Sequence, residues 1–420
     1  MATVLSFNKL LRIAAIGGGL EMYDFVIYMS LVPIIGPIFF ASSSAFMSMM
    51  IAFSVFALGY FIRPLGGIVM GHFGDRIGRK KTFIASILLM SIPVLLIGLL
   101  PTPAQMGELA TFLFILLRLI QGLAVGAEIP GSMTFIAEHA PPHRRGFASG
   151  FIYCGLNLGI SGALLFFVAL SSVLSRAQMD QFGWRIPFIL GALLGLIAFY
   201  LRRSSQESPA FLSLSQHHQI KKVPIVDVLQ KKALILRGVG VTALGATLIT
   251  LASTYQSAYL IGIVGFNHSI IWLVVVATFI SACIQPYCGG WSDRMGRVKM
   301  LRVAALATLI LAYPIFFLLS LHQWLSAILA FGLLIILMGL IIGIYPAILV
   351  ELFPTALRYS GYALVYNIGF ALFAGLSPLV ATYLIHHFHL VTAPAICLMV
   401  SSVLCLLGLM GLPDHYDAVL

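Results

Sequence analysis

A charged loop motif occurs twice in this chain, first as Gly71-His-Phe-Gly-Asp75-Arg76-Ile-Gly78-Arg79-Lys80 and again as Gly289-Gly-Trp-Ser-Asp293-Arg294-Met-Gly296-Arg297-Val-Lys299, at an offset of 218 residues. A second motif repeats in the same order at an offset of 213: Glu138, Pro141 and Arg145 are followed by Glu351, Pro354 and Arg358. Two motifs that repeat in the same order, and at nearly the same spacing, indicate that the chain arose by duplication of one half. We therefore expect two equivalent halves, residues 1–201 and 233–420, joined by the polar linker 202–232.

The composition identifies these halves as bundles of membrane-spanning helices. Apolar residues make up 60% of the 420 positions, charged residues only 9%, and the mean hydropathy is +1.05. A soluble domain carries roughly 25% charged residues, and a disordered chain combines low hydrophobicity with high charge, so both classes are excluded. A membrane β-barrel would alternate polar and apolar residues, whereas runs such as 87–90 are continuously apolar.

The spacing of the charged residues predicts twelve spanning helices. A helix needs about 20 apolar residues to cross a bilayer, and uncharged intervals such as 238–292 are long enough for two helices and a turn. The predicted spans, six in each half, are 13–38, 46–70, 83–101, 108–131, 147–173, 185–201, 234–262, 268–290, 300–320, 323–349, 360–386 and 391–412.

The distribution of basic residues predicts the orientation. Most of the 24 lysines and arginines lie at the amino end or in loops that follow even-numbered spans, including Arg202 and Arg203, whereas Arg176 and Arg185 lie on the opposite face. Basic loops stay in the cytoplasm, so both termini are expected there. The net charge of +11 is an orientation signal, and no nucleic-acid partner is expected, because the charges are spread over many short loops.

The motif Gly-x-x-x-Asp-Arg-x-Gly-Arg, present twice, resembles that of the major facilitator superfamily. Within this superfamily the chain is similar to the metabolite:proton symporters, which include proline/betaine, shikimate, ketoglutarate and citrate carriers. The similarity extends over about residues 12–412 and is carried by Glu21-Met-Tyr-Asp24-Phe-x-x-Tyr28, Phe61-Ile-Arg63-Pro64-Leu-Gly66-Gly67, Arg118-Leu-Ile-Gln121-Gly122-Leu-Ala-Val-Gly126, Gly183-Trp184-Arg185-Ile-Pro187-Phe188, Glu351-Leu-Phe-Pro354-Thr-x-x-Arg358-Tyr-Ser-Gly361 and Tyr366-Asn367. The resemblance implies an all-α membrane fold of twelve helices in two six-helix halves, in a bacterial inner membrane.

The departures from this family are modest. Met22 replaces a common tryptophan, and Ala127 interrupts the usual Gly-Gly-Glu before Glu128. The tail after residue 412 is shorter than the extended carboxyl-terminal helix of some osmolyte carriers, which disfavours an osmosensing role.

Ionisable residues within the spans are few, and they lie mainly in the first half. A charge at membrane depth is costly, so such residues are functional candidates. Glu21 and Asp24 lie three positions apart on the first span, with Tyr28 on the same stripe, and Arg118 lies near the middle of the fourth span with Gln121 on its face. The equivalent of Arg118 in the second half is apolar, so the chemistry is expected in the first half.

We interpret Asp24, with Glu21, as the proton carrier and Arg118 as its alternating partner. Removal from water favours the neutral carboxyl group, whereas a nearby arginine favours the carboxylate, and the arginine itself stays charged. If Arg118 binds Asp24 in the empty state and an anionic substrate in the loaded state, substrate binding frees Asp24 to take up a proton. The resemblance implies the same roles, which are proposed for a first-helix acid and a fourth-helix arginine in related symporters. The alternative is a structural ion pair.

Neutral polar residues are weaker candidates for substrate contacts. The candidates are Tyr28 and Gln121 in the first half and Tyr255, Gln256, Tyr366 and Asn367 on the seventh and eleventh spans. Discontinuities in spanning helices are where such groups line a cavity. Packing is the alternative role for each of them.

The repeated loop motif is interpreted as a gating latch that holds the halves together in one state. Asp75 is expected near the positive amino end of a neighbouring helix or beside an arginine. The predicted gating residues are Gly71, Asp75, Arg76, Arg79, Asp293, Arg294 and Arg297. The alternative is that they are ordinary basic-loop residues.

These features predict secondary active transport by alternating access: symport of protons with a small carboxylate-bearing metabolite, such as an organic acid, an amino acid or a betaine. The alternative within transport is an uncoupled uniporter or a proton-driven exporter of a small amphipathic compound. An enzyme is disfavoured because the sequence lacks a nucleophile–base spacing, a metal triad and a phosphate loop, and a receptor because no regulatory domain accompanies the spans. The expected partners are the substrate, protons and the lipid bilayer; neither cofactor nor metal is expected, and the protein is expected to act as a monomer.

Overall fold

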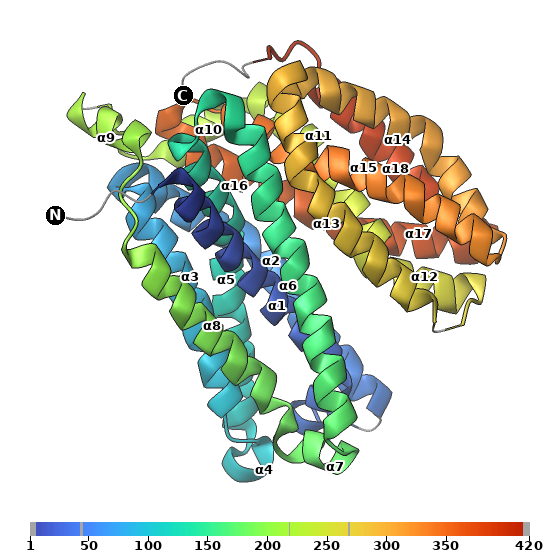
Figure 1. The fold of residues 1–420 in the computed structure, drawn as a ribbon. Helices are drawn as coiled ribbons and strands as arrows, with labels where there is room; N and C mark the ends of the chain where they lie inside the picture. Colours follow the sequence, from blue (N-terminus) through green and yellow to red (C-terminus); the bar gives the residue numbers. More distant parts are fainter. Residues whose placement is uncertain (1–5, 43–44, 218, 268, 415–420) are drawn as a thin grey trace.

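The computed structural model describes residues 6–42, 45–217, 219–267 and 269–414, and within these ranges it is built from helices (Figure 1). Eleven helical segments of the described chain are long and apolar enough to cross a membrane. The protein is therefore a multi-pass membrane protein. A further apolar helix, α18 (Pro394–Gly408), has only 15 residues, about 22 Å at 1.5 Å per residue. The twelfth span, and with it the cytoplasmic location of both termini, stays a prediction.

The N-terminal bundle consists of long helices that contain the first six predicted spans. Continuous helices suit a lipid environment because nearly every backbone N–H and C=O then has an internal partner. The third predicted span extends two residues past the end of its helix; the others lie within theirs. The helices are α1 (Phe7–Phe39), α2 (Ala45–Ile77), α3 (Arg79–Leu99), α5 (Glu108–His139), α6 (Arg145–Val173) and α8 (Arg185–Arg203), with α4 (Pro103–Met106), η1 (Pro142–Arg144), α7 (Arg176–Gln178) and η2 (Met179–Gly183) in the connections.

The C-terminal bundle differs because two of its predicted spans, 234–262 and 360–386, are interrupted by π-helical turns. These turns, η3, η4 and η6, adjoin or lie close to the polar residues Tyr255, Gln256 and Asn367. The elements are α11 (Lys232–Ile249), η3 (Thr250–Thr254), α12 (Gln256–Tyr259), η4 (Leu260–Val264), α13 (Ile270–Met295), α14 (Arg297–Ser320), α15 (Trp324–Glu351), η5 (Thr355–Leu357), α16 (Arg358–Gly369), η6 (Phe370–Ala374), α17 (Gly375–Phe388) and α18.

The segment predicted as a linker contains two short helices, α9 (Pro209–Gln216) and α10 (Pro224–Gln230). The division of the chain into functional halves at this segment stays a prediction.

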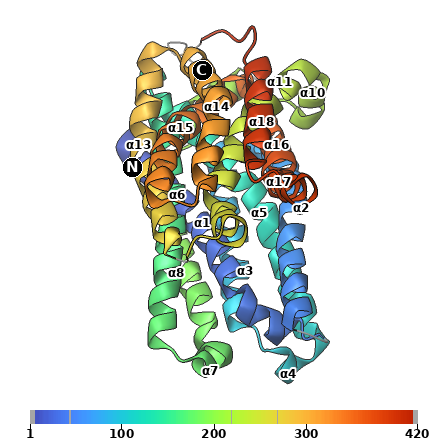
Figure 2. The same ribbon diagram turned by 90° about the vertical axis from the view of Figure 1, so that its right-hand side faces the viewer.

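The two bundles join at the end of the molecule that carries both repeated motifs, which we call the latch end. Here α6 packs against α13 and α2 packs against α16. Small residues permit the close approach: a Cβ on Gly146 would lie 2.3 Å from the carbonyl oxygen of Gly289, and one on Gly71 would lie 2.9 Å from Cα of Ser360. In Figure 1 the ribbons of the bundles diverge from this end toward α4 and α7 on one side and α12 and α17 on the other; Figure 2 shows α4 and α7 at the far end of the N-terminal bundle.

Candidate functional site

Arg118 and Asp24 are in contact inside the N-terminal bundle. Helix α1 carries Asp24 and α5 carries Arg118, and Nη1 of Arg118 lies 3.2 Å from Oδ2 of Asp24. Gln121 donates from Nε2 to the same oxygen at 3.2 Å. Arg118 and Asp24 are each 8% exposed. The predicted contact between these two residues is confirmed, whereas its role in proton coupling stays a prediction.

Aromatic rings surround the guanidinium group of Arg118. Its Cζ atom lies 3.9 Å from the ring centre of Tyr28, 5.3 Å from that of Phe188 and 5.9 Å from that of Phe114. Ring faces attract a cation, and more strongly when water is excluded. The hydroxyl of Tyr28 donates to the carbonyl oxygen of Ala52 at 2.8 Å. In this conformation Tyr28 therefore supports Arg118 through its ring and does not offer its hydroxyl proton to the site.

Several buried polar atoms of this site have no hydrogen-bond partner among the described residues. They are Nε and Nη2 of Arg118, Oδ1 of Asp24, Oε1 of Gln121 and both carboxylate oxygens of Glu21. The Nε–H and Nη2–H bonds form one edge of the planar guanidinium fork, an arrangement that binds a carboxylate through two parallel hydrogen bonds. Unpartnered buried polar groups cost free energy. Such a concentration of them indicates a site that takes up protons, water or a ligand.

These side chains line a cavity of about 40 Å³ between α1, α2 and α5. Besides Glu21, Asp24, Arg118 and Gln121, its lining includes the buried Arg63 of α2 and apolar side chains of all three helices. The volume accommodates about three water molecules, whereas pockets for metabolites measure roughly 300–1,000 Å³. In this conformation the cavity suits protons and water. A metabolite reaches Arg118 only if the surrounding helices move.

The predicted candidates Tyr255, Gln256 and Tyr366 lie in the C-terminal bundle. The hydroxyl of Tyr255 lies 3.0 Å from Oγ1 of Thr382. Both amide atoms of Gln256 are buried without a partner in the part of the chain that the structure describes. Tyr255 and Tyr366 belong to a large apolar cluster that includes side chains of both bundles, whereas Tyr28 belongs to a separate cluster in the N-terminal bundle. The structure thus brings together the first-half candidates and leaves these three apart from them.

Asn367 connects the two bundles. Its Nδ2 donates to the carbonyl oxygen of Gly126 on α5 at 2.7 Å and to that of Ala363 at 2.8 Å. Both hydrogens of the amide nitrogen are thereby used. In this conformation Asn367 has the packing role that was the alternative to substrate binding, and a contact with substrate stays a prediction.

The first copy of the repeated motif forms a buried charge cluster, the first latch, which consists of Asp75, Arg79, Glu138 and Arg358. Asp75 accepts hydrogen bonds from the backbone N–H groups of Tyr359 (3.3 Å) and Ser360 (2.9 Å) at the start of α16. It also lies 2.9 Å from Nη2 of Arg79. The amino end of a helix favours negative charge. The predicted placement of Asp75 is confirmed, and both of its expected neighbours are present.

Glu138 extends the first latch across the bundle interface. Its Oε1 lies 2.8 Å from Nη1 of Arg358, and its Oε2 lies 3.3 Å from Nε of Arg79. Arg79 also donates to the carbonyl oxygen of Thr355 at 2.7 Å. The first latch therefore contains contacts from both bundles, and its four charged side chains are buried.

The second copy forms the second latch, which consists of Asp293, Arg297, Glu351 and Arg145. Asp293 accepts hydrogen bonds from the N–H groups of Gly146 (2.8 Å) and Phe147 (2.9 Å) at the start of α6. Arg297 lies 2.5 Å from Asp293 and 2.6 Å from Glu351, and Arg145 lies 3.4 Å from Glu351. The contacts match those of the first latch with the two bundles exchanged. The repeat in the sequence is thus a repeat in geometry.

The two remaining arginines of the motif take no part in these clusters. Arg76 and Arg294 are exposed, whereas Arg79 and Arg297 are each 1% exposed. An exposed arginine matches the alternative interpretation, a basic-loop residue. A gating role for Arg76 and Arg294 stays a prediction.

Sequence reasoning missed two acidic residues that cap helices at the latch end. Glu207 accepts the N–H of Lys80 at 3.0 Å, near the start of α3, and Asp414 accepts the N–H of Val298 at 2.8 Å, near the start of α14. Each acid follows the last helix of its own half, and the two positions are 207 residues apart. This third repeated position was the signal in the sequence that could have identified the two acids.

Arg202 requires a correction, because it was assigned to a basic loop. It is 0% exposed, and its guanidinium group contacts both carboxylate oxygens of Glu128 on α5. A Cβ on Gly17 of α1 would overlap this guanidinium, so the glycine makes room for it. Nothing in the local sequence distinguishes Arg202 from its neighbour Arg203, because a pair of arginines at a helix end is typical of a cytoplasmic loop.

Comparisons with known proteins find transporters that are similar to this chain in sequence and in fold. The family model of the Major Facilitator Superfamily matches residues 14–366 and 266–418. The ectoine/proline transporter ProP of Corynebacterium glutamicum is 32% identical over 415 residues, which cover 95% of this chain and 82% of that protein. The citrate-proton symporter of Klebsiella pneumoniae is 31% identical over 391 residues, with coverage of 90% and 86%. Among solved structures, the proton:xylose symporter XylE has the same fold, with a TM-score of 0.78 at 18% identity over 96% of this chain and 94% of that one.

Proposed function

Because the chain belongs to the Major Facilitator Superfamily, it is a membrane transporter, and we propose that it carries out proton-coupled symport of a small carboxylate-bearing metabolite. The proposed location is the bacterial inner membrane, and the proposed mechanism is alternating access. One observation carries the proposal: Arg118 binds Asp24 through Nη1, while its Nε and Nη2 edge has no partner among the described residues. The names of the relatives specify proline, ectoine and citrate, each of which carries a carboxylate.

Charge balance at Arg118 gives the proposed coupling. In the empty state, the guanidinium and the carboxylate of Asp24 neutralise each other. Uptake of a proton by Asp24 removes its charge, and the carboxylate of the substrate then supplies the negative charge that Arg118 requires. For a substrate with a single negative charge, the site has the same net charge in both states, which limits the cost of burying ions at membrane depth. Such a substrate without a proton, or a proton without the substrate, would leave an unbalanced charge. For a zwitterion, Arg118 still exchanges one carboxylate partner for another.

Glu21 is proposed as a second position for the proton. It lies one turn before Asp24 on α1, lines the same cavity and is 1% exposed. A carboxyl group in such surroundings is more stable with its proton bound unless a cation compensates it. Glu21 therefore provides an intermediate position for the proton between Asp24 and the charged residues nearer the latch end.

The two latches are proposed as the gate at one end of the transport path. Each of them contains bonds between the bundles, so separation of the bundles at the latch end breaks both. Both latches and the Arg118 site belong to a single chain, and we therefore propose that the monomer is the functional unit.

Transport by purified protein in liposomes tests the proposal. Thermal-shift screening of carboxylates, amino acids and betaines first identifies a substrate. Asp24→Asn should abolish accumulation driven by a pH gradient, while exchange of substrate at equal pH partly survives. The matched control is Asp180→Asn, since Asp180 forms an exposed ion pair with Arg176. Unchanged uphill uptake by the Asp24 variant would exclude this residue from coupling.

The role of Arg118 has a separate test. Arg118→Lys should weaken substrate binding by at least about tenfold, because an ammonium group lacks the planar two-donor edge. Arg176→Lys is the control and should bind substrate as the wild type does. Wild-type affinity in the Arg118 variant would place the substrate elsewhere. A protonophore distinguishes the alternative, because an uncoupled uniporter equilibrates substrate equally well with and without it.

A further inference from the structure

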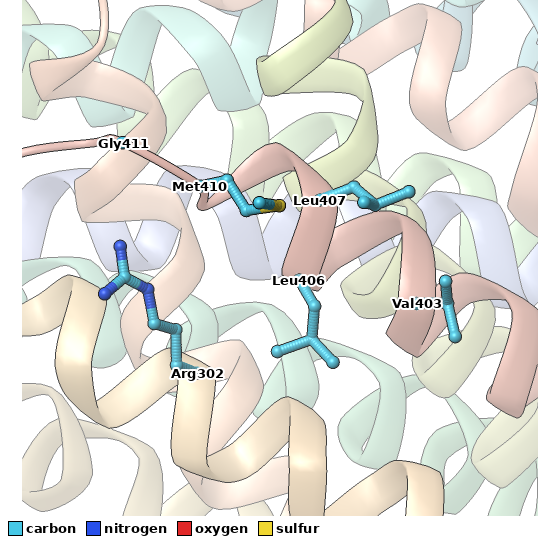
Figure 3. Close-up of a pocket in the computed structure, with 6 residues that line it drawn as sticks. All are labelled: Arg302, Val403, Leu406, Leu407, Met410 and Gly411. Carbon is cyan, nitrogen blue, oxygen red and sulfur yellow. The ribbon is translucent and has the colours of Figure 1, made fainter.

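A second cavity lies on the outer surface of the C-terminal bundle, between α14 and α18 (Figure 3). Its volume is about 440 Å³, and it is lined by Arg302, Val403, Leu406, Leu407, Met410 and Gly411. Val403, Leu407 and Met410 are 43%, 55% and 62% exposed. Exposed apolar side chains on a membrane protein face lipid chains. This cavity is therefore a hollow in the lipid-facing surface, distinct from the Arg118 site inside the other bundle.

Arg302 is the basic residue of this hollow. It is exposed, and its Nη2 donates to the carbonyl oxygen of Leu409, just past the end of α18, at 2.8 Å. This bond fixes the guanidinium group at the edge of the hollow, where Figure 3 shows it on the side opposite Val403. Arginine has five N–H donors, so this bond leaves others for a ligand.

The surroundings of Arg302 are positively charged. Lys299 is exposed one turn earlier on α14. Nη2 of Arg237 lies 3.6 Å from the position of a Cβ on Gly411, at the same end of the hollow. The acidic Asp414 already accepts the N–H groups at the start of α14. Three basic side chains thus gather beside an apolar surface.

Arg302 lies near one end of α14, a helix long and apolar enough to cross a membrane. It lies five residues after the start of α14, about 8 Å along the helix axis. Basic groups near helix ends extend toward the interface, and basic pockets between helices recognise anionic headgroups. We propose that this hollow binds an anionic phospholipid, whose phosphate contacts Arg302 and whose acyl chain lies along Val403 and Leu407. The bound lipid joins α14 to α18.

Native mass spectrometry of the full-length protein, incubated with equal amounts of phosphatidylglycerol and phosphatidylcholine, tests this proposal. The wild type should retain phosphatidylglycerol preferentially. Arg302→Gln should weaken its retention about fivefold, the effect of one basic group near an anionic headgroup. Arg302→Lys, which keeps the charge, should stay within about twofold of the wild type. Val403→Trp should also lower retention, because the indole occupies the part of the hollow proposed for the acyl chain without changing any charge.

Arg12→Gln is the matched control, since Arg12 is an exposed arginine near the start of α1. It should retain phosphatidylglycerol as the wild type does. Equal retention of the two lipids by the wild type would overturn the proposal. So would an equal loss in Arg12→Gln and Arg302→Gln, or a loss in Arg302→Lys as large as that in Arg302→Gln, because the guanidinium would then act only through its bond to Leu409.

Discussion

Replacement of Glu138 by glutamine should loosen the latch end without changing the volume of the side chain. The carboxylate of Glu138 accepts hydrogen bonds from Arg79 in its own bundle, from Arg358 in the other bundle and from Ser208 in the linker. Glutamine keeps the shape but has no negative charge. Arg358 then loses its ion-pair partner, whereas Arg79 keeps its ion pair with Asp75.

The size of the effect follows from which bonds break when the latch opens. The bond between Glu138 and Arg79 lies within one bundle and persists, so it cancels in the comparison of closed and open states. The bond between Glu138 and Arg358, 2.8 Å long, connects the bundles and is lost. A hydrogen bond that involves a charged group contributes about 1.5–3 kcal/mol. A loss of about 2 kcal/mol raises the equilibrium constant for opening roughly 30-fold.

Hydrogen exchange in lipid nanodiscs measures this opening. The N–H groups of Tyr359 and Ser360 are bonded to Asp75 across the first latch, so they should exchange roughly 30-fold faster in Glu138→Gln. The N–H groups of Gly146 and Phe147, bonded to Asp293 in the second latch, should also exchange faster. The second effect follows if the bundles separate as rigid bodies.

The control is Glu108→Gln, an exposed position at the opposite end of the same helix, α5. It should leave exchange at the latch end unchanged. Wild-type protection of the start of α16 in Glu138→Gln would refute the assignment of Glu138 to the closed state. Faster exchange at the first latch alone would show that the two latches open independently.

Three further substitutions test helix packing within the N-terminal bundle, the cap of α3 and a contact between the two bundles. Gly126→Ala places a Cβ 2.1 Å from a carbonyl oxygen of α2. It should lower the free energy of unfolding by about 1–3 kcal/mol, measured as a lower unfolding temperature. The control is Gly162→Ala, whose Cβ meets nothing within 4 Å and should not lower that temperature. Glu207→Gln weakens the cap of α3 and should cost about 1 kcal/mol in the same thermal assay, and an unchanged unfolding temperature would argue against a capping role. Tyr153→Phe removes the hydroxyl that contacts Tyr345 of the other bundle; a loss of about 1 kcal/mol should accelerate exchange at the latch end about fivefold, and unchanged exchange would contradict a contribution of this contact to closure.

The contact between Asp24 and Arg118 was predictable because an uncompensated charge at membrane depth is so costly. With few ionisable residues in the spans, an acid and an arginine at similar depth have few other partners. The position of Asp75 at the start of a helix followed from the same reasoning about charge and helix ends. The chemistry of these residues limits their neighbours before any packing is known.

Other partners depended on how the helices rotate and approach each other. Arg202 looks like a loop residue, yet it enters the bundle because Gly17 leaves space for its guanidinium group. Asn367 reaches the carbonyl oxygen of Gly126 because α16 and α5 pack closely at that point. No local pattern encodes these contacts, since they arise between residues more than 180 positions apart along the chain.

The sequence by itself determined the helical membrane architecture, its internal repeat and the pair of charges at its centre, because hydrophobic length and the cost of buried charge are properties of short segments. Only the tertiary structure decided that the two motifs form reciprocal latches, that the Arg118 cavity is small in this conformation, and that a basic hollow lies on the outside of the C-terminal bundle. Those features depend on the distances between helices. Side-chain shape over the whole molecule sets such distances, and composition alone does not.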